Sequence, residues 1–241
     1  MADLPGFASA PGYVRSVDFE HVLVLLDYRT GRVQCLLPAA AALWHEAATT
    51  GRLDSMAPAL ATRLLDAGLL VPTTAPTPWP LPMTAKAPVA SWGGSEHTAG
   101  TTRLGIACSP TAVAALGTVI GIKLAGPRYT AMHRLTAVIK RATTVTRRPA
   151  SPTEAASAVN AVRRAGWYSP ARTACLEESA AAVLLLASRR LSVTWCHGVA
   201  PDPVRLHAWI QTDDGAPAAE PSSTLAFTPA LTIGARHQRQ H

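Results

Sequence analysis

Three residues in the second half of the chain have side chains that together suit nucleophilic catalysis: Cys175, His207 and Glu220. A thiolate attacks carbonyl carbon, an imidazole holds and transfers the proton, and a carboxylate orients the imidazole. Cys175 precedes the apolar run 180–187. With Thr173 as N-cap it is the second residue of a helix, where free N–H groups and the helix dipole favour a thiolate. An inert core cysteine is the alternative interpretation.

The sequence offers four acidic partners for His207: Asp202, Asp213, Asp214 and Glu220. At about 3.3 Å per strand residue, Asp213 lies roughly 20 Å along the strand from His207, and Asp214 lies farther away. A hairpin loop at Asp214-Gly215 places Glu220 opposite Trp209, one diagonal step from His207. A shift of one residue would move Glu220 to the other face. Glu220 is the first choice and Asp202, in the loop before the strand, is the second.

These residues need a helix and a group of strands to hold them. Apolar patterning predicts a buried helix from Cys175, strands over 191–199 and 205–212, a return strand over 216–220 and a last strand over 225–233. Residues 103–148 are predicted to be helical. The apolar stretch 111–124, at about 14 residues, is shorter than the roughly 20 that a bilayer requires, so a buried helix is favoured over a membrane span. The basic residues after it predict a solvated face or a docking surface for an acidic partner: Arg134, Lys140, Arg141, Arg147 and Arg148.

The first 71 residues predict a separate small module. Alternating apolar residues predict strands over 13–17, 22–26 and 32–37, with a hairpin turn between Asp27 and Gly31. Pro38 begins a helix to about residue 48. A second helix follows Asp54 as N-cap and ends at Gly68. Three strands with these helices indicate a winged-helix-like domain.

Six prolines between residues 72 and 100 exclude a continuous helix and favour an extended linker. The predicted organisation is therefore an N-terminal domain over 1–71, a Pro-rich linker over 72–100 and a second domain over 101–241. The fold class is α+β.

Composition limits the compartment and the partners. With 22 basic and 15 acidic residues the net charge is +7, which suits nucleic acid, an anionic membrane or an acidic peptide without choosing among them. The four cysteines form no CxxC or CxxH pair, so no metal site, cofactor or disulfide framework is expected: Cys35, Cys108, Cys175 and Cys196. The first residues lack the form of a secretion signal, so a cytoplasmic protein is expected.

The run Leu-Leu-Asp-Tyr-Arg-Thr-Gly-Arg-Val, followed by Leu-Pro-Ala-Ala-Ala-Ala-Leu-Trp, resembles the PqqD-like precursor recognition element of peptide-modifying systems. In that family a leader peptide adds as an extra strand beside the third strand and packs against the last helix. The resemblance implies a groove formed by Val33, Cys35, Leu37, Leu60 and Leu64. This chain is shorter than the family between its two helices. The alternative interpretation is that all five are core residues.

The order of Cys on a helix start, His on a strand and an acid on the next strand resembles the transglutaminase-like branch of papain-fold enzymes. The wording Cys-Leu-Glu-Glu-Ser, His-Ala-Trp-Ile and Glu-Pro is closer to the leader peptidase of lasso peptide biosynthesis. The resemblance makes Cys175 the nucleophile, His207 the base and Glu220 the acid, although the family usually has Asp there. It implies a cysteine peptidase that cleaves the leader from a lasso precursor peptide and passes the core peptide to an ATP-dependent, asparagine-synthetase-like cyclase.

Other functions share parts of this pattern. A winged-helix-like module with positive charge suits a DNA-binding regulator, but the helix 56–65 carries only Arg63 as a base-reading side chain, so no nucleic-acid partner is expected. A non-catalytic scaffold that presents the precursor, and acyl transfer to an amine instead of water, are the remaining alternatives.

Overall fold

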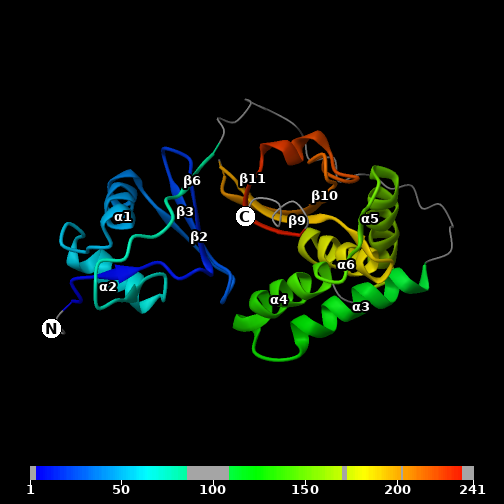
Figure 1. The fold of residues 1–241 in the computed structure, drawn as a ribbon, viewed down its shortest axis with the longest axis horizontal. Coiled ribbons are helices and arrows are strands. Elements are labelled where there is room, and N and C mark those ends of the chain that lie inside the picture. Colours follow the sequence, from blue (N-terminus) through cyan, green and yellow to red (C-terminus); the bar gives the residue numbers. More distant parts are fainter. Residues whose placement is uncertain (1–3, 86–108, 170–172, 202, 235–241) are drawn as a thin grey trace. The chain divides into compact units, whose positions relative to one another are not determined.

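The structure is a computed structural model that describes residues 4–85, 109–169, 173–201 and 203–234. The chain divides into two compact units, residues 1–87 and 88–241, each with its own buried core (Figure 1). The mixture of helices and separate sheets confirms the predicted α+β class.

The first unit contains a four-stranded sheet with the order β4-β3-β2-β6. Its strands are β2 (Val14–Asp18), β3 (Leu23–Asp27), β4 (Arg32–Leu36) and β6 (Met83–Thr84). The first three are antiparallel neighbours, and β6 runs parallel to β2. The Asp27 carboxylate accepts the backbone N–H groups of Arg29 and Thr30, which closes the turn between β3 and β4. The three predicted strands are confirmed, each within one residue.

Helices α1 (Pro38–Thr50) and α2 (Pro58–Asp66) cover one face of this sheet. Both begin with proline at the first helical position, where the missing N–H costs nothing. The N-cap of α2 is Ala57, so the predicted N-cap, Asp54, lies outside the helix. The core beneath the helices contains Leu23, Leu25 and Leu36 from the sheet, with Trp44 and Leu64 from the helices. The likeness to a winged-helix module stays a prediction.

Part of the predicted linker belongs to this unit. Val71–Pro72 form β5, which pairs with β1 (Ala8–Ser9), and β6 extends the main sheet. Trp79 is buried and packs edge-on against Trp44, with ring centroids 5.5 Å apart. The prolines exclude a helix as predicted, but apolar burial of the tryptophan holds the extended chain against the unit. The remainder of the predicted linker, residues 86–100, lies outside the described residues.

The second unit is organised around helix α6 (Cys175–Ser188), which contacts the other helices and the sheet (Figure 1). The other helices are α3 (Pro110–Leu124), α4 (Ala131–Thr143) and α5 (Pro152–Trp167). Because α6 is apolar on nearly every side after its first turn, it is stable only when surrounded. The predicted buried helix is confirmed here.

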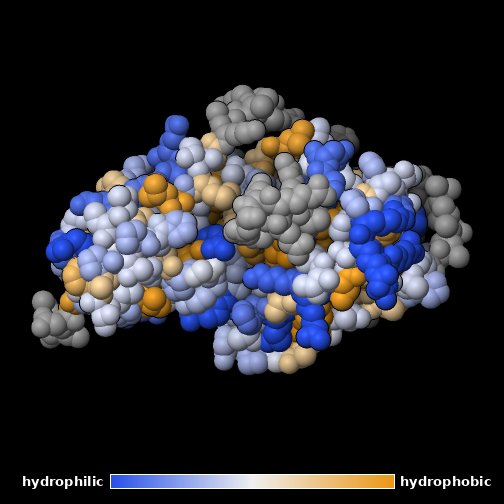
Figure 2. Space-filling model, in the orientation of Figure 1, coloured by the Kyte–Doolittle hydropathy of each residue, from blue (hydrophilic) through white to orange (hydrophobic). Residues whose placement is uncertain are grey.

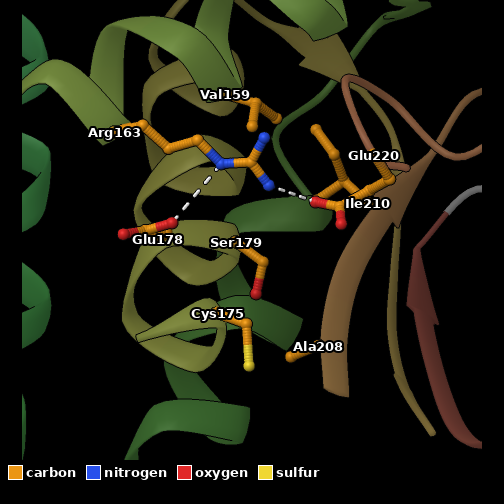
Figure 3. Close-up of a pocket in the computed structure, with 8 residues that line it drawn as sticks. All are labelled: Val159, Arg163, Cys175, Glu178, Ser179, Ala208, Ile210 and Glu220. Atoms are coloured by element: carbon orange, nitrogen blue, oxygen red, sulfur yellow. Dashed lines mark hydrogen bonds and ion pairs between the residues drawn. The ribbon is translucent and has the colours of Figure 1, made fainter. Parts of the chain in front are cut away.

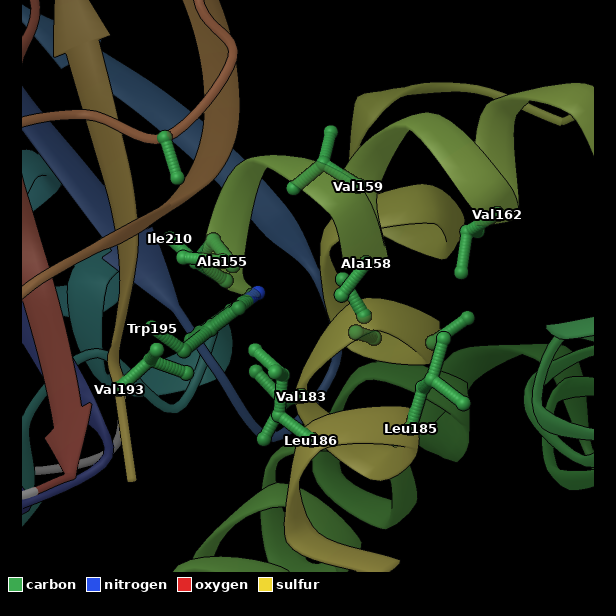
Figure 4. Close-up of a cluster of buried hydrophobic side chains, with 14 of the residues drawn as sticks. Ala155, Ala158, Val159, Val162, Val183, Leu185, Leu186, Val193, Trp195 and Ile210 are labelled. Atoms are coloured by element: carbon green, nitrogen blue, oxygen red, sulfur yellow. The ribbon is translucent and has the colours of Figure 1, made fainter. Parts of the chain in front are cut away.

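A three-stranded antiparallel sheet with the order β10-β9-β11 lies against α6. Its strands are β9 (Thr194–Ala200), β10 (Arg205–Gln211) and β11 (Thr228–Gly234). Trp195 and Ile210 are register partners in the core (Figure 4), and the Trp195 Nε1–H donates to Ser179 of α6 at 3.0 Å. A short parallel pair, β7 (Arg148–Pro149) with β8 (Leu191–Ser192), completes the unit.

Helix α5 is absent from the sequence-based prediction. Ser151 accepts the Glu154 backbone N–H at 3.3 Å, and the Glu154 carboxylate accepts the Ser151 N–H at 2.9 Å. This capping box, with Pro152 at the first helical position, is a start signal that the sequence contains. The helix buries Ala155, Val159 and other small apolar residues against α6.

The predicted return strand over 216–220 is wrong. Among the described residues, one bridge, Gln211 with Pro217, pairs this segment with β10. It lies one residue out of the predicted register, which paired Gln211 with Ala218. The chain then turns, and Ala219 takes a left-handed φ of 54°. The Ala218 N–H still donates to the Ile210 carbonyl at 3.0 Å, and the strand pairing ends at the turn that follows.

The apolar stretch of α3 lies on the surface of the second unit instead of at its centre. Ala112, Leu116 and Val119 are buried, whereas Val113 and Leu124 are exposed. In the space-filling view, hydrophobic residues reach the surface in small separate patches among hydrophilic ones (Figure 2). Among the described residues, no helix combines the length and apolar character that crossing a membrane requires.

Two residues of the predicted basic face have structural partners. Arg134 donates to the last carbonyls of α3, at 2.9 Å to Ile122 and 3.0 Å to Lys123. Arg148 pairs with Glu154 at 2.7 Å. The net charge therefore overstates the number of cations in this unit that are available to a partner.

Replacing Leu186, which is 0% exposed in the core of the second unit, by alanine should lower the free energy of opening of α6 by about 2–5 kcal/mol. The measurement is hydrogen exchange of the α6 amides followed by mass spectrometry. Leu124→Ala is the matched control, because Leu124 is 77% exposed. Equal effects of the two substitutions would contradict the described packing.

Candidate functional site

Cys175 is the first residue of α6, and its side chain is half-buried. The N-cap is Ala174, not the predicted Thr173. Alanine has no capping oxygen, and the Glu177 carboxylate accepts the Ala174 backbone N–H at 3.0 Å instead. In Figure 3 the Cys175 sulfur projects from the helix end toward Ala208 of β10. A thiol here borders both the helix N-terminus and the sheet.

His207 lies on β10, an edge strand, with its ring between two aromatic neighbours. It stacks on Trp209 with centroids 5.7 Å apart and contacts Phe227 at 5.2 Å. Trp209 in turn lies over Gly198 of β9. A Cβ at Gly198 would come within 2.7 Å of both the Trp209 ring and the Thr228 carbonyl. The missing side chain at Gly198 therefore lets the Trp209 ring lie flat and support the imidazole.

Glu220 reaches His207 from the turn after β10. The His207 Nε2 lies 2.9 Å from Glu220 Oε2, and the Thr224 hydroxyl donates to the same oxygen at 3.3 Å. The Glu220 side chain is buried. The predicted neighbours therefore meet, but through the turn at Ala219 and not through the cross-strand pairing that the prediction used.

Cys175, His207 and Glu220 form one hydrogen-bonded set. Burial lowers the pKa of His207, but hydrogen bonds and charge attraction from Cys175 and Glu220 outweigh this effect and raise the pKa from 6.5 to about 9. Since Glu220 holds Nε2, the opposite ring nitrogen, Nδ1, is the one left for the sulfur. A cysteine, an imidazole and an orienting carboxylate in this order can carry out nucleophilic catalysis.

A second imidazole, that of His197, lies in the same sheet. Its register partner on β10 is Ala208, and its ring stacks on Trp195. Burial and, to a smaller extent, the charge of His207 lower the pKa of His197 to about 4. At neutral pH only His207 of the two is therefore protonated.

Two cations near the site are absent from the sequence-based prediction. Lys123 of α3 pairs with the buried carboxylate of Glu177. Arg163 of α5 contacts both Glu178 and Glu220, which both line the pocket drawn in Figure 3. The capping-box sequence at the start of α5 is the signal from which that helix, and with it Arg163, could have been found.

The residues predicted to form a leader groove do not share one surface. Strand alternation places Val33 and Cys35 of β4 on the face opposite the core residue Leu36, and both are exposed. Leu37 is 71% exposed, at the end of the same edge strand. Leu64 of α2 is 1% exposed and is a core residue, and Leu60 packs partly buried against that core. Leu64 is therefore a core residue, as the alternative interpretation held.

The second candidate acid, Asp202, lies outside the described residues, as does Cys108. Within the described ranges, no group of three or more His, Cys, Asp or Glu side chains is arranged to hold a metal ion. Asp213 and Asp214, excluded by distance in the sequence-based prediction, lie in the turn beyond the end of β10.

Residues 123–232 match the family model described as the transglutaminase-like superfamily. This part of the chain is similar to transglutaminase-like domains. The match begins at the end of α3 and includes α6, β9, β10 and most of β11, so the matched residues include Cys175, His207 and Glu220. No curated protein and no solved structure that was compared with the chain gave a match.

The raised pKa of His207 should make stability depend on alkaline pH. Because the folded pKa is about 9 and the ordinary value is 6.5, this group stabilises the fold fully below pH 6.5, and its contribution is lost as the pH rises through 9. Nuclear magnetic resonance titration of the His207 ring should give a midpoint near 9, and Glu220→Gln should lower it. The signal is assigned with His207→Gln. A midpoint near 6.5 in the unmodified protein would refute the described contacts.

Proposed function

We propose that this protein is a cysteine peptidase that binds the leader of a lasso precursor peptide and cleaves it off. The observation that carries the proposal is the hydrogen-bonded set Cys175, His207 and Glu220 at the N-terminus of a buried helix, in a part of the chain similar to transglutaminase-like domains. The first unit supplies the leader-binding edge. An ATP-dependent, asparagine-synthetase-like cyclase then uses the freed N-terminus of the core peptide.

The chemistry follows from the site. The Cys175 thiolate, paired with the His207 imidazolium, attacks the scissile carbonyl carbon and forms a C–S bond. His207 then donates its proton to the leaving amine as the C–N bond breaks. In the second stage His207 takes a proton from water, the resulting hydroxide attacks the thioester carbonyl, and the C–S bond breaks. The Cys175 backbone N–H, free at the helix start, suits the negative oxygen that forms in each stage.

Glu220 has an electrostatic and a geometric part in this cycle. Its carboxylate holds Nε2 at 2.9 Å, so the imidazole keeps a tautomer and orientation that leave Nδ1 for the sulfur. The carboxylate also stabilises the imidazolium of the resting ion pair, in agreement with the raised pKa of His207.

The first unit supports leader binding through β4. This strand is at the edge of its sheet, so its outer backbone groups are open to pairing with an added strand. Val33, Cys35 and Leu37 place apolar surface along the same edge. A leader bound there raises the local concentration of the scissile bond at a catalytic domain in the same chain. Leu60 and Leu64 are better assigned to the core of the unit than to the groove.

Cys175→Ala should reduce precursor cleavage by at least about a thousandfold, because no other group replaces the nucleophile. Leader affinity, measured by fluorescence anisotropy with a labelled leader peptide, should stay unchanged. Cys196→Ala removes a thiol that is buried in the sheet and is the matched control for the loss of a cysteine. Retained cleavage by Cys175→Ala would end the proposal, since another nucleophile would then be acting.

Val33→Lys and Cys35→Lys should each weaken leader binding about tenfold, close to 1.4 kcal/mol, because a charge would meet the apolar side chains of the added strand. The same anisotropy assay measures the change. Met83→Lys places the same charge on β6, at the opposite edge of the same sheet, and should leave binding unchanged. Equal losses at both edges would show that β4 is not the leader site.

A further inference from the structure

One guanidinium contacts both Glu220 and the helix that begins with Cys175. The Arg163 Nη2 donates to Glu220 Oε1 at 2.5 Å, and Nη1 donates to the Ala219 carbonyl at 2.6 Å. The Nε lies 3.4 Å from Glu178 Oε2. Glu178 is in the first turn of α6, on the helix that begins with Cys175. In Figure 3 Arg163 extends from α5 between the two carboxylates.

The two oxygens of the Glu220 carboxylate have different partners. Oε1 accepts from Arg163, and Oε2 lies against His207 and Thr224. A carboxylate with one oxygen fixed by a guanidinium has little freedom to rotate, so the other oxygen keeps its direction. The donation to the Ala219 carbonyl fixes the left-handed turn that brings Glu220 back toward β10.

We propose that Arg163 is a positioning residue of the peptidase: it holds Glu220 against His207 and ties that acid to the helix that carries Cys175. The inference rests on the proposed function, because it assigns a part to Arg163 in the same reaction. It makes α5 part of the catalytic architecture, although none of its side chains is proposed to touch the reacting atoms.

The main alternative is that Arg163 only neutralises buried negative charge. The two roles predict opposite changes in the His207 titration midpoint when Arg163 is removed. Without a neutralising cation, the Glu220 charge would act more strongly on the imidazolium, and the His207 titration midpoint would rise. Without a positioning group, Glu220 would leave the imidazole, and the midpoint would fall from about 9 toward 6.5. The groups that act on His207 are Cys175 from α6 and Glu220 from the turn. His197 of β9 is affected by the charge of His207, and Arg205 lies on the same strand as His207 and over the Phe227 ring.

The decisive variant is Arg163→Met, which removes the guanidinium and keeps an unbranched side chain. The His207 midpoint, measured by nuclear magnetic resonance, should fall, and kcat for precursor cleavage should fall by roughly 10- to 100-fold with KM almost unchanged. Adding guanidinium ion to Arg163→Ala should restore part of the rate. An unchanged or higher midpoint would overturn the proposal.

Arg164→Met is the matched control, because it removes a neighbouring cation from the same helix and should leave the midpoint and the rate unchanged. If Arg163→Met does not fold, Arg163→Lys decides the question. An ammonium cannot reproduce the forked contact with Glu220 and the Ala219 carbonyl, so the midpoint should again fall, and an unchanged value overturns the proposal.

The titration separates this inference from the proposed function. It needs no precursor peptide, and the rate of Cys175 alkylation by iodoacetamide gives a second readout without cleavage. A protein that never cleaves precursor but shows the lowered midpoint in Arg163→Met would refute the peptidase proposal while keeping the positioning role. A protein that cleaves precursor but keeps the same His207 midpoint in Arg163→Met would refute the positioning role while supporting the peptidase proposal.

Discussion

The second unit depends on keeping negative charge paired at the N-terminus of a buried helix. Glu177 and Glu178 lie in the first turn of α6, where the helix dipole favours them, but the two carboxylates repel each other unless cations lie near them. Lys123 from α3 and Arg163 from α5 pair with them. The surrounding helices therefore do more than cover apolar surface, because they also supply the cations that neutralise the acidic helix start beside Cys175.

The orientation of the His207 imidazole depends on a second constraint, which is steric. Its ring is held by Trp209, whose own place requires the absence of a side chain at Gly198. The hydrogen bond that His207 donates to Glu220 then fixes the rotation of the ring. Packing from one side and hydrogen bonding from the other leave His207 with a single orientation. This agreement between packing and polar contacts is what a preorganised site requires.

The sequence predicted the features that local patterns encode. The strands of the first unit, the buried helix from Cys175 and the strand of His207 follow from apolar periodicity and turn residues. The meeting of His207 with Glu220 was predicted from a hairpin register that is wrong by one residue, and a turn with a left-handed Ala219 brings them together instead. Periodicity carries no information on such a turn. Arg163 was missed because its helix was missed, and its three contacts link parts of the chain that only the tertiary fold brings together.

Residues 216–220, the segment that carries Glu220, have fewer backbone hydrogen bonds than the sheet beside them. The backbone of this segment is joined to the chain around β10 by one bridge, made of two hydrogen bonds, Thr212 to Ala216 and Ala218 to Ile210, and Arg163 donates to its Ala219 carbonyl, whereas β9 is paired along its length on both sides. Regions with few such bonds open locally at a lower free energy than the whole domain. Warming or mild denaturant will therefore detach the acid while the core around α6 stays folded. The contact between Glu220 and His207 then follows a local equilibrium of its own, and it is lost at a lower temperature than the fold of the second unit.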